Sequence, residues 1–112
     1  MKMSFGSFIR AKRLKVGYTL RKFAEHINLS PTFVSKMERG EFDPPGEDKI
    51  IAMAQALSVN PDELVLMAGR VPNTIKAMIL NRPMLVPLLH TANTMNDDDL
   101  KQLIDSVIHK MR

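Results

Sequence analysis

Residues 19–45 read TLRKFAEHINLSPTFVSKMERGEFDPP, a pattern that predicts two short helices joined by a tight turn. Thr19 can cap the first helix, and Ser30 followed by Pro31 is a typical start for the second. Asn28 lies between them where the chain must turn sharply, and asparagine is among the few residues other than glycine that tolerate a positive φ. Because the connection is so brief, the two helices cannot lie antiparallel and are expected to cross steeply.

Further helices are expected on both sides of this pair. Apolar residues recur at helical spacing over residues 5–16 and 50–57, and Asn60-Pro61 starts another helix. The sequence therefore predicts five helices between residues 5 and 69. When the first and fourth helices pack behind the pair, the helix over residues 30–39 is left exposed along one side.

The composition favours an all-α chain. Of the 112 residues, 45% are hydrophobic but only 5% aromatic, so the core must consist mainly of Leu, Ile, Val, Met and Ala. Cysteine is absent, which excludes disulfides and zinc fingers and fits a reducing cytoplasm. No apolar stretch approaches the roughly 20 residues that span a bilayer, and residues 1–6 lack the apolar core of a signal peptide. We expect a cytoplasmic protein without membrane contact.

Charge is unevenly distributed along the chain. Residues 1–40 contain nine Lys or Arg against two Glu, a net of +7, whereas residues 41–112 contain seven Lys or Arg against ten Asp or Glu, a net of −3. This asymmetry suggests one face for a polyanion and another for a different partner, although a merely solvated charged surface would give the same pattern.

Residues typical of catalysis or metal binding do not cluster in the sequence. His26, His90 and His109 show no paired-ligand spacing, so no metal and no cofactor is expected. No glycine-rich phosphate loop or nucleophile elbow is present. We therefore do not expect an enzyme.

Residues 19–45, together with IIAMAQALSVNPDELV at residues 50–65, resemble the phage repressor/Cro-like helix-turn-helix family, also called the xenobiotic-response-element family. The resemblance covers about residues 5–69. Ala24 matches the small residue that lets the two helices approach, and residues 35–40 match the family's helix end. The resemblance implies an all-α, five-helix repressor-like DNA-binding domain over residues 1–69.

The resemblance also implies roles for individual residues. The residues expected to face base edges in the major groove are Pro31, Thr32, Phe33 and Lys36. Phosphate contacts, which position the protein without specifying sequence, are expected from Thr19, Arg21, Lys22, Ser35, Arg39 and the backbone near Phe42. Arg13 and Glu38 match a pair that in the family joins the first helix to the third.

Three positions depart from the family's pattern. Leu20 stands where the family usually has Gln, so a common phosphate-facing amide is missing, and Asn28 replaces a usual Gly. Pro31 at the first reading position removes a side-chain donor. Fewer polar base contacts are therefore expected, and DNA shape would carry more of the specificity.

Residues 70–112 predict a helical extension. Residues 73–80 and 84–92 look helical, with Pro83 suited to a helix start and Pro87 implying either a kink or a later start. A last helix capped by Asn96 carries one apolar stripe, formed by Leu100, Leu103, Ile104, Val107, Ile108 and Met111. The stripe either folds back on its own domain or pairs with a second copy. Because helix-turn-helix proteins usually bind two half-sites, we favour a homodimer interface.

These inferences lead to a working hypothesis with two alternatives. The hypothesis is a sequence-specific regulator that binds double-stranded DNA as a homodimer, a repressor on a palindromic operator by default, with activation still open. One alternative is an antitoxin-type regulator whose C-terminal helices also bind a partner toxin. The other is a protein-binding adaptor that has lost DNA contact, whose binding would be insensitive to salt.

Overall fold

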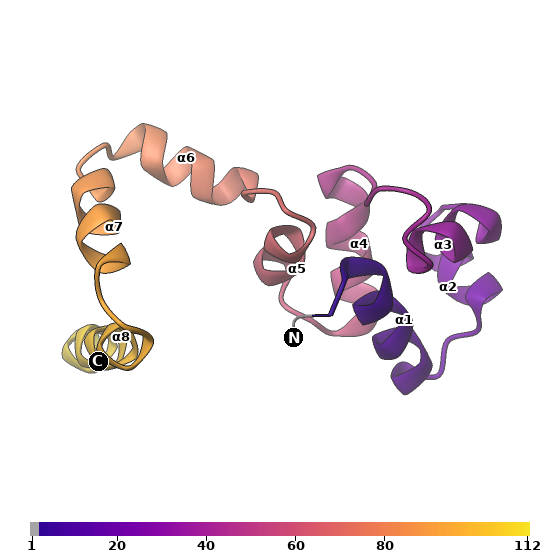
Figure 1. Ribbon diagram of the computed structural model, residues 1–112, viewed down its shortest axis with the longest axis horizontal. Helices are drawn as coiled ribbons and strands as arrows, with labels where there is room; N and C mark the ends of the chain where they lie inside the picture. The colour runs from indigo at the N-terminus through magenta and orange to yellow at the C-terminus, as the bar shows by residue number, and fades with distance from the viewer. Residues whose placement is uncertain (1–2) are drawn as a thin grey trace. The chain divides into compact units, whose positions relative to one another are not determined.

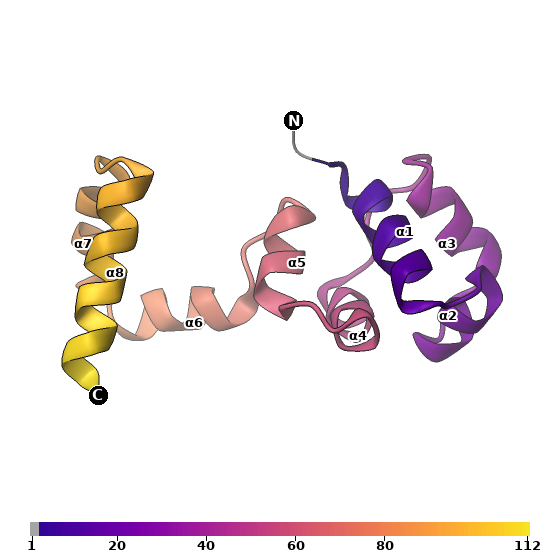
Figure 2. The ribbon, with the colours of Figure 1, turned by 90° about the horizontal axis from the view of Figure 1, so that it is seen from below.

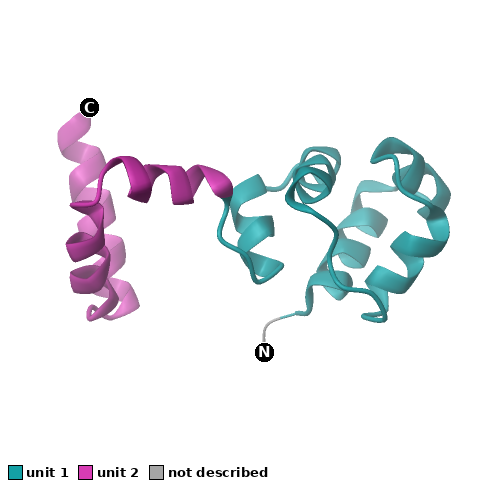
Figure 3. Ribbon diagram, turned by 90° about the horizontal axis from the view of Figure 1, so that it is seen from above, with its two compact units in different colours: residues 1–72 teal, residues 73–112 magenta. Residues whose placement is uncertain are grey.

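The computed structural model describes residues 3–112, and over these residues it contains α-helices and no strand (Figure 1). The predicted all-α fold is thus confirmed. The helices are α1 (Phe5–Val16), α2 (Leu20–His26), α3 (Pro31–Glu38), α4 (Glu47–Leu57), α5 (Pro61–Met67), α6 (Asn73–Asn81), α7 (Leu85–Asn93) and α8 (Asp97–Met111). The chain divides into two compact units, residues 1–72 and residues 73–112 (Figure 3).

Helix starts follow the capping residues of the sequence. The side chains of Thr19, Ser30 and Asn60 accept hydrogen bonds from the backbone N–H three residues on, at 3.1, 3.0 and 3.0 Å. Each of these bonds satisfies a donor that the first helical turn leaves without an intrahelical partner. Ser4 caps α1 in the same way at 3.2 Å, which the sequence analysis did not predict.

The turn between α2 and α3 depends on one left-handed residue and one distant lysine. Asn28 has φ 59°, as predicted for this position. The Leu29 N–H donates to the Ala24 carbonyl at 2.9 Å, which ends α2. From α4, the Lys49 ammonium donates to the carbonyls of Ile27 and Asn28 at 3.3 and 3.4 Å. Lys49 thus connects this turn to α4.

The core of the first unit is formed by side chains from all five of its helices. Its largest fully buried members include Ile9, Phe23, Val34, Ile50, Met53 and Leu64. Figures 1 and 2 show α3 lying against both α1 and α2, while α4 lies against α5. Ala24 is fully buried, in keeping with its predicted role as a small residue between helices.

Gly6 allows α1 and α3 to approach closely. A Cβ atom added to Gly6 would lie 2.3 Å from the Met37 carbonyl oxygen and 2.7 Å from the Glu38 carbonyl oxygen. Both atoms belong to the backbone and cannot rotate away. Gly6 is therefore required by the packing of α1 on the end of α3.

The first unit continues past Gly69, where the sequence analysis ended the DNA-binding domain. The Arg70 guanidinium donates to the carbonyl of Pro44 at 2.7 Å and also to that of Pro45, both in the loop before α4. Pro72 is fully buried. Both contacts hold the end of the unit, so its structural boundary lies at Pro72.

The second unit contains α6, α7 and α8 and buries none of its residues. α7 begins at Leu85, so Pro87 lies in its first turn, where a missing N–H costs no helical hydrogen bond. Asn96 caps α8 by accepting from the Asp99 N–H at 2.8 Å. None of the helices described is long and apolar enough to cross a membrane.

We expect Gly6→Ala to destabilise the first unit by about 1–3 kcal/mol, because the added methyl group must displace backbone atoms of α3. An alanine in a helix ordinarily gains up to about 1 kcal/mol over glycine, so a loss here would be diagnostic of the close approach. Denaturant unfolding of the variant measures the change. Ser7→Ala, on the exposed neighbour, is the control and should lie within about 0.5 kcal/mol of the parent. A Gly6→Ala variant as stable as the control would contradict the close approach.

Candidate nucleic-acid interface

α3 has a buried side and an outward side. Val34, Met37 and Glu38 are buried in the first unit, whereas Pro31 and Thr32 are exposed. Phe33, Ser35 and Lys36 are half-buried at the border between the two sides. The predicted base-contacting residues therefore all have at least partial access to solvent on one short helix.

A buried ion pair holds the end of this helix. The Arg13 Nε and Nη2 donate to the Glu38 Oε2 and Oε1 at 2.8 and 3.0 Å, a bidentate arrangement. Nη1 of the same guanidinium donates to the Tyr18 carbonyl at 3.0 Å. Both residues are 7% exposed, so the structure places together the two residues that the resemblance pairs. Bidentate geometry fixes direction as well as distance, which orients α3 on α1.

Phe42, in the loop after α3, joins two of the predicted base-contacting residues. Its ring centroid lies 5.4 Å from that of Phe33, and the Lys36 ammonium lies 5.2 Å from its centroid. A cation over an aromatic face is attracted by the ring's electrons. The sequence analysis gave Phe42 only a backbone role, because these ring contacts depend on how the loop folds back beside α3.

The predicted phosphate-contacting residues of α2 lie on its exposed N-terminal turn. Thr19, Arg21 and Lys22 are all exposed. The Thr19 oxygen accepts from the Lys22 N–H, and its hydroxyl hydrogen stays free to donate. The interface thus has two exposed cations and one hydroxyl at the start of α2.

Arg39 has an intramolecular partner that the sequence analysis did not predict. Its Nε donates to the Glu41 Oε2 at 2.8 Å, and the two side chains are 60% and 53% exposed. Exposed ion pairs contribute little to stability, so this pair can exchange for another. Glu41 therefore competes with any anion that approaches Arg39.

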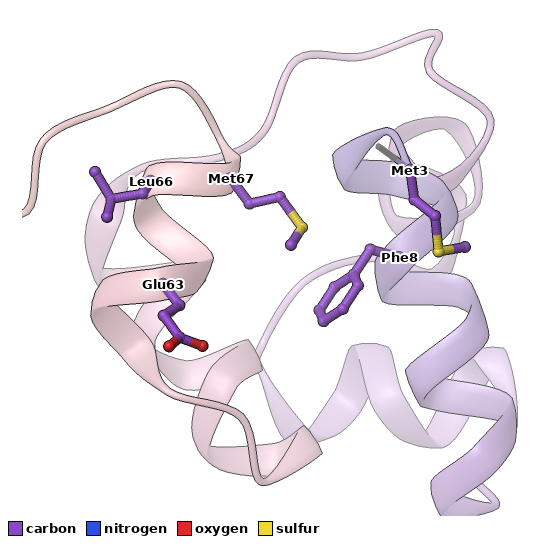
Figure 4. Close-up of a pocket in the computed structure, with 5 residues that line it drawn as sticks. All are labelled: Met3, Phe8, Glu63, Leu66 and Met67. Atoms are coloured by element: carbon purple, nitrogen blue, oxygen red, sulfur yellow. The ribbon is translucent and has the colours of Figure 1, made fainter. Parts of the chain in front are cut away.

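The pocket between α1 and α5 lies outside these residues. It has a volume of about 520 Å³ and is lined by Met3, Phe8, Glu63, Leu66 and Met67. Figure 4 shows Phe8 and Met67 pointing toward one another across it. Within residues 3–112 no group of His, Asp or Glu side chains could hold a metal ion. The candidate interface consists of the hydrogen-bond donors and cations on α2 and α3.

The chain is similar to proteins of one family. The family described as Helix-turn-helix matches residues 9–64, half of the chain. Two HTH-type transcriptional regulators of Mycobacterium tuberculosis, from strains CDC 1551/Oshkosh and ATCC 25618/H37Rv, are each 36% identical over 64 residues. The match covers 57% of this chain and 45% of each relative, so the chain spans less than half the length of these relatives.

Solved structures show the same similarity. The P22 c2 repressor in complex with a synthetic operator is 30% identical with a TM-score of 0.51, over 56% of this chain and 94% of that one. ClgR, the clp gene regulator of Corynebacterium glutamicum, is 29% identical with a TM-score of 0.50, over 59% and 84%. A chain of the SinR protein/SinI protein complex is 18% identical with a TM-score of 0.53, over 96% and 99%, a likeness of fold alone.

We expect Glu41→Gln to raise affinity for duplex DNA about two- to fivefold, because it frees Arg39 from its exposed ion pair. Titration of labelled duplex at fixed salt measures the change. Asp43→Asn is the matched control, since it removes one negative charge from the same loop but leaves the partner of Arg39 in place. Equal gains in the two variants would assign the effect to net charge and overturn the competition.

Proposed function

This chain belongs to the Helix-turn-helix family of DNA-binding transcriptional regulators of the repressor type, and from that premise we propose that it binds a palindromic operator as a homodimer. The observation that supports this most is the outward side of α3, held in place by the buried Arg13–Glu38 pair. A helix of this kind fits the major groove of B-DNA, which is about 12 Å wide. We propose a non-catalytic role in the cytoplasm.

In this proposal Lys36 donates to guanine O6 and N7 in the major groove. The Phe42 ring lies beside the Lys36 ammonium and would help to position it there. Phe33 and the Thr32 methyl group contact thymine methyl groups. Pro31 provides no side-chain donor, so it makes a van der Waals contact only. With one strong polar donor among four reading positions, DNA shape contributes to the specificity.

Phosphate contacts would position α3 over the bases. We assign three of them to the start of α2, namely Thr19, Arg21 and Lys22. The others are assigned to the end of α3 and the loop after it, namely Ser35, Arg39 and the backbone near Phe42. Each cation that neutralises a phosphate releases counterions, so binding would weaken steeply as salt rises. This dependence separates the proposal from a protein-binding adaptor.

Dimerisation would use the apolar stripe of α8. Leu103, Ile104, Val107 and Ile108 are between 40% and 48% exposed, and Met111 is 81% exposed. Apolar rows of this length on a helix are ordinarily covered. In the antitoxin-type alternative the same stripe would bind a partner toxin, and a stable homodimer of the purified chain would count against that alternative.

Selection of bound sequences from random duplex DNA, at two salt concentrations, tests the proposed function. We expect an enriched inverted repeat with half-sites about ten base pairs apart, and weaker recovery at high salt. A folded protein that enriches no sequence at either salt would overturn the proposal.

We expect Lys36→Ala to weaken binding to the selected operator by about 1–3 kcal/mol and to relax preference at one base position in each half-site. The comparison variant is Lys22→Ala, which should weaken binding on every sequence alike and lower the salt slope by about 1. Titrations on the operator and on a scrambled duplex measure both effects. Loss of the same size on both duplexes for Lys36→Ala would remove it from the base-reading set.

Truncation after Pro72 should give a folded monomer that binds single half-sites weakly, because the core and the Arg70 contacts all lie within residues 1–72. Sedimentation gives the mass, and circular dichroism the fold. A truncated protein that is still dimeric would place the dimer interface in the first unit instead of on α8.

A further inference from the structure

We propose that α8 pairs antiparallel with α8 of a second copy, with the acidic start of each helix beside the basic end of the other. The proposal rests on the homodimer of the proposed function and adds the orientation, the register and the charge pairs of its interface. It is carried by the exposure of α8 together with the placement of its charges about the apolar stripe.

The second unit lacks a core of its own. None of α6, α7 and α8 has a buried residue. α7 exposes Leu88 and Leu89 at 55% and 51%, in addition to the stripe of α8. Isolated helices of nine to fifteen residues are marginal in water, and most helical stability in proteins comes from packing an apolar face. A further surface must therefore cover α8 for the unit to be stable.

The stripe is symmetrical about its own middle. In an antiparallel pair, Leu100 can lie level with Met111 of the second copy, Leu103 with Ile108, and Ile104 with Val107. These six positions are the whole stripe, so one register brings every apolar residue into the seam at once. Such self-complementarity is what a two-fold interface requires.

Charged residues flank the stripe in a pattern that also fits this register. At about 100° per residue, Asp99 and Lys110 fall on one flank of the stripe and Arg112 falls on the other, while Asp97 continues the stripe at its N-terminal end, on the same side as Arg112. Two antiparallel helices bring like flanks together. Asp99 then lies near Lys110 of the second copy, and Asp97 near Arg112 of the second copy. In each pair the two residues are offset by about two residues, or roughly 3 Å along the helix axis. The interface would gain four such pairs by symmetry.

The opposite orientation is disfavoured by the same charges. Parallel helices bring unlike flanks together at the same level, which would place Lys110 beside Arg112 of the second copy. Lys101 and Asp105 lie on the same side as Arg112. Lys101 comes within two residues of Arg112 of the second copy in the antiparallel pair and of Asp99 in the parallel one, but Asp105, four residues after it, offsets its charge in both. Charge thus favours the antiparallel pair over the parallel one.

Charge reversal in the full chain tests the orientation. One variant carries Asp97→Lys and Asp99→Lys, and the other carries Lys110→Glu and Arg112→Glu. Each alone should dimerise about tenfold more weakly at low salt, because attractive pairs become repulsive. An equimolar mixture should recover wild-type affinity as a heterodimer, since all four pairs are attractive again. Sedimentation with one variant mass-tagged measures both results.

Matched controls separate pairing from changes within the helix. Asp98→Lys and His109→Glu alter charge in the same turns but on the face opposite the stripe, so neither should change the dimer affinity by more than about twofold. The single variant Lys110→Glu decides between orientations: it weakens an antiparallel dimer, and it strengthens a parallel one by pairing with Arg112.

Three outcomes would overturn the inference: strengthening by Lys110→Glu, equal effects in variants and controls, or a mixture that stays as weak as its components. A wild-type chain that is monomeric would instead refute the homodimer itself. Because these readouts are masses, they are independent of whether operator DNA is bound.

Discussion

The bidentate ion pair between Arg13 and Glu38 is the contact on which the arrangement of the first unit depends. It joins the last turn of α1 to the last residue of α3, while Nη1 of the same guanidinium donates to the Tyr18 carbonyl just after α1. A buried guanidinium must have its donors satisfied, so α1, the turn at Tyr18 and the end of α3 have to meet at one point. Gly6 allows the two helices to approach closely enough for this pair to form. The outward side of α3 is consequently held in a fixed orientation by its packing on α1.

The two units differ in how much of their apolar surface they bury. The first draws core residues from five helices and encloses them, with Lys49 and Arg70 fastening the two loops that flank the recognition region. The second buries nothing by itself and leaves an apolar stripe on a helix with opposite charges at its ends. A surface of donors and cations suits DNA, whereas an apolar row suits another protein chain. A dimeric regulator needs both, on separate parts of one chain.

Local features of the fold were predictable because their causes are local. Thr19, Ser30, Asn60 and Asn96 cap helices through bonds to backbone atoms three residues on, and Asn28 takes the left-handed conformation that a short interhelical turn needs. Contacts between distant segments left no such pattern. Lys49 lies more than twenty residues from the carbonyls it binds, as does Arg70, and Glu41 faces Arg39 only because the loop after α3 turns back. The contacts of the Phe42 ring with Phe33 and with the Lys36 ammonium depend on the same loop.

The sequence by itself determined the helices, most of their caps, the family and the apolar stripe of α8, because hydrophobic period and capping act over one or two turns. The base-contacting and phosphate-contacting residues came from the resemblance, and they stay predictions. Tertiary structure alone decided which of those side chains already have partners within the chain, where the first unit ends, and that the second unit by itself leaves most of the stripe of α8 exposed. The reason is that burial and pairing depend on which distant segments pack together, and local sequence patterns do not specify those contacts.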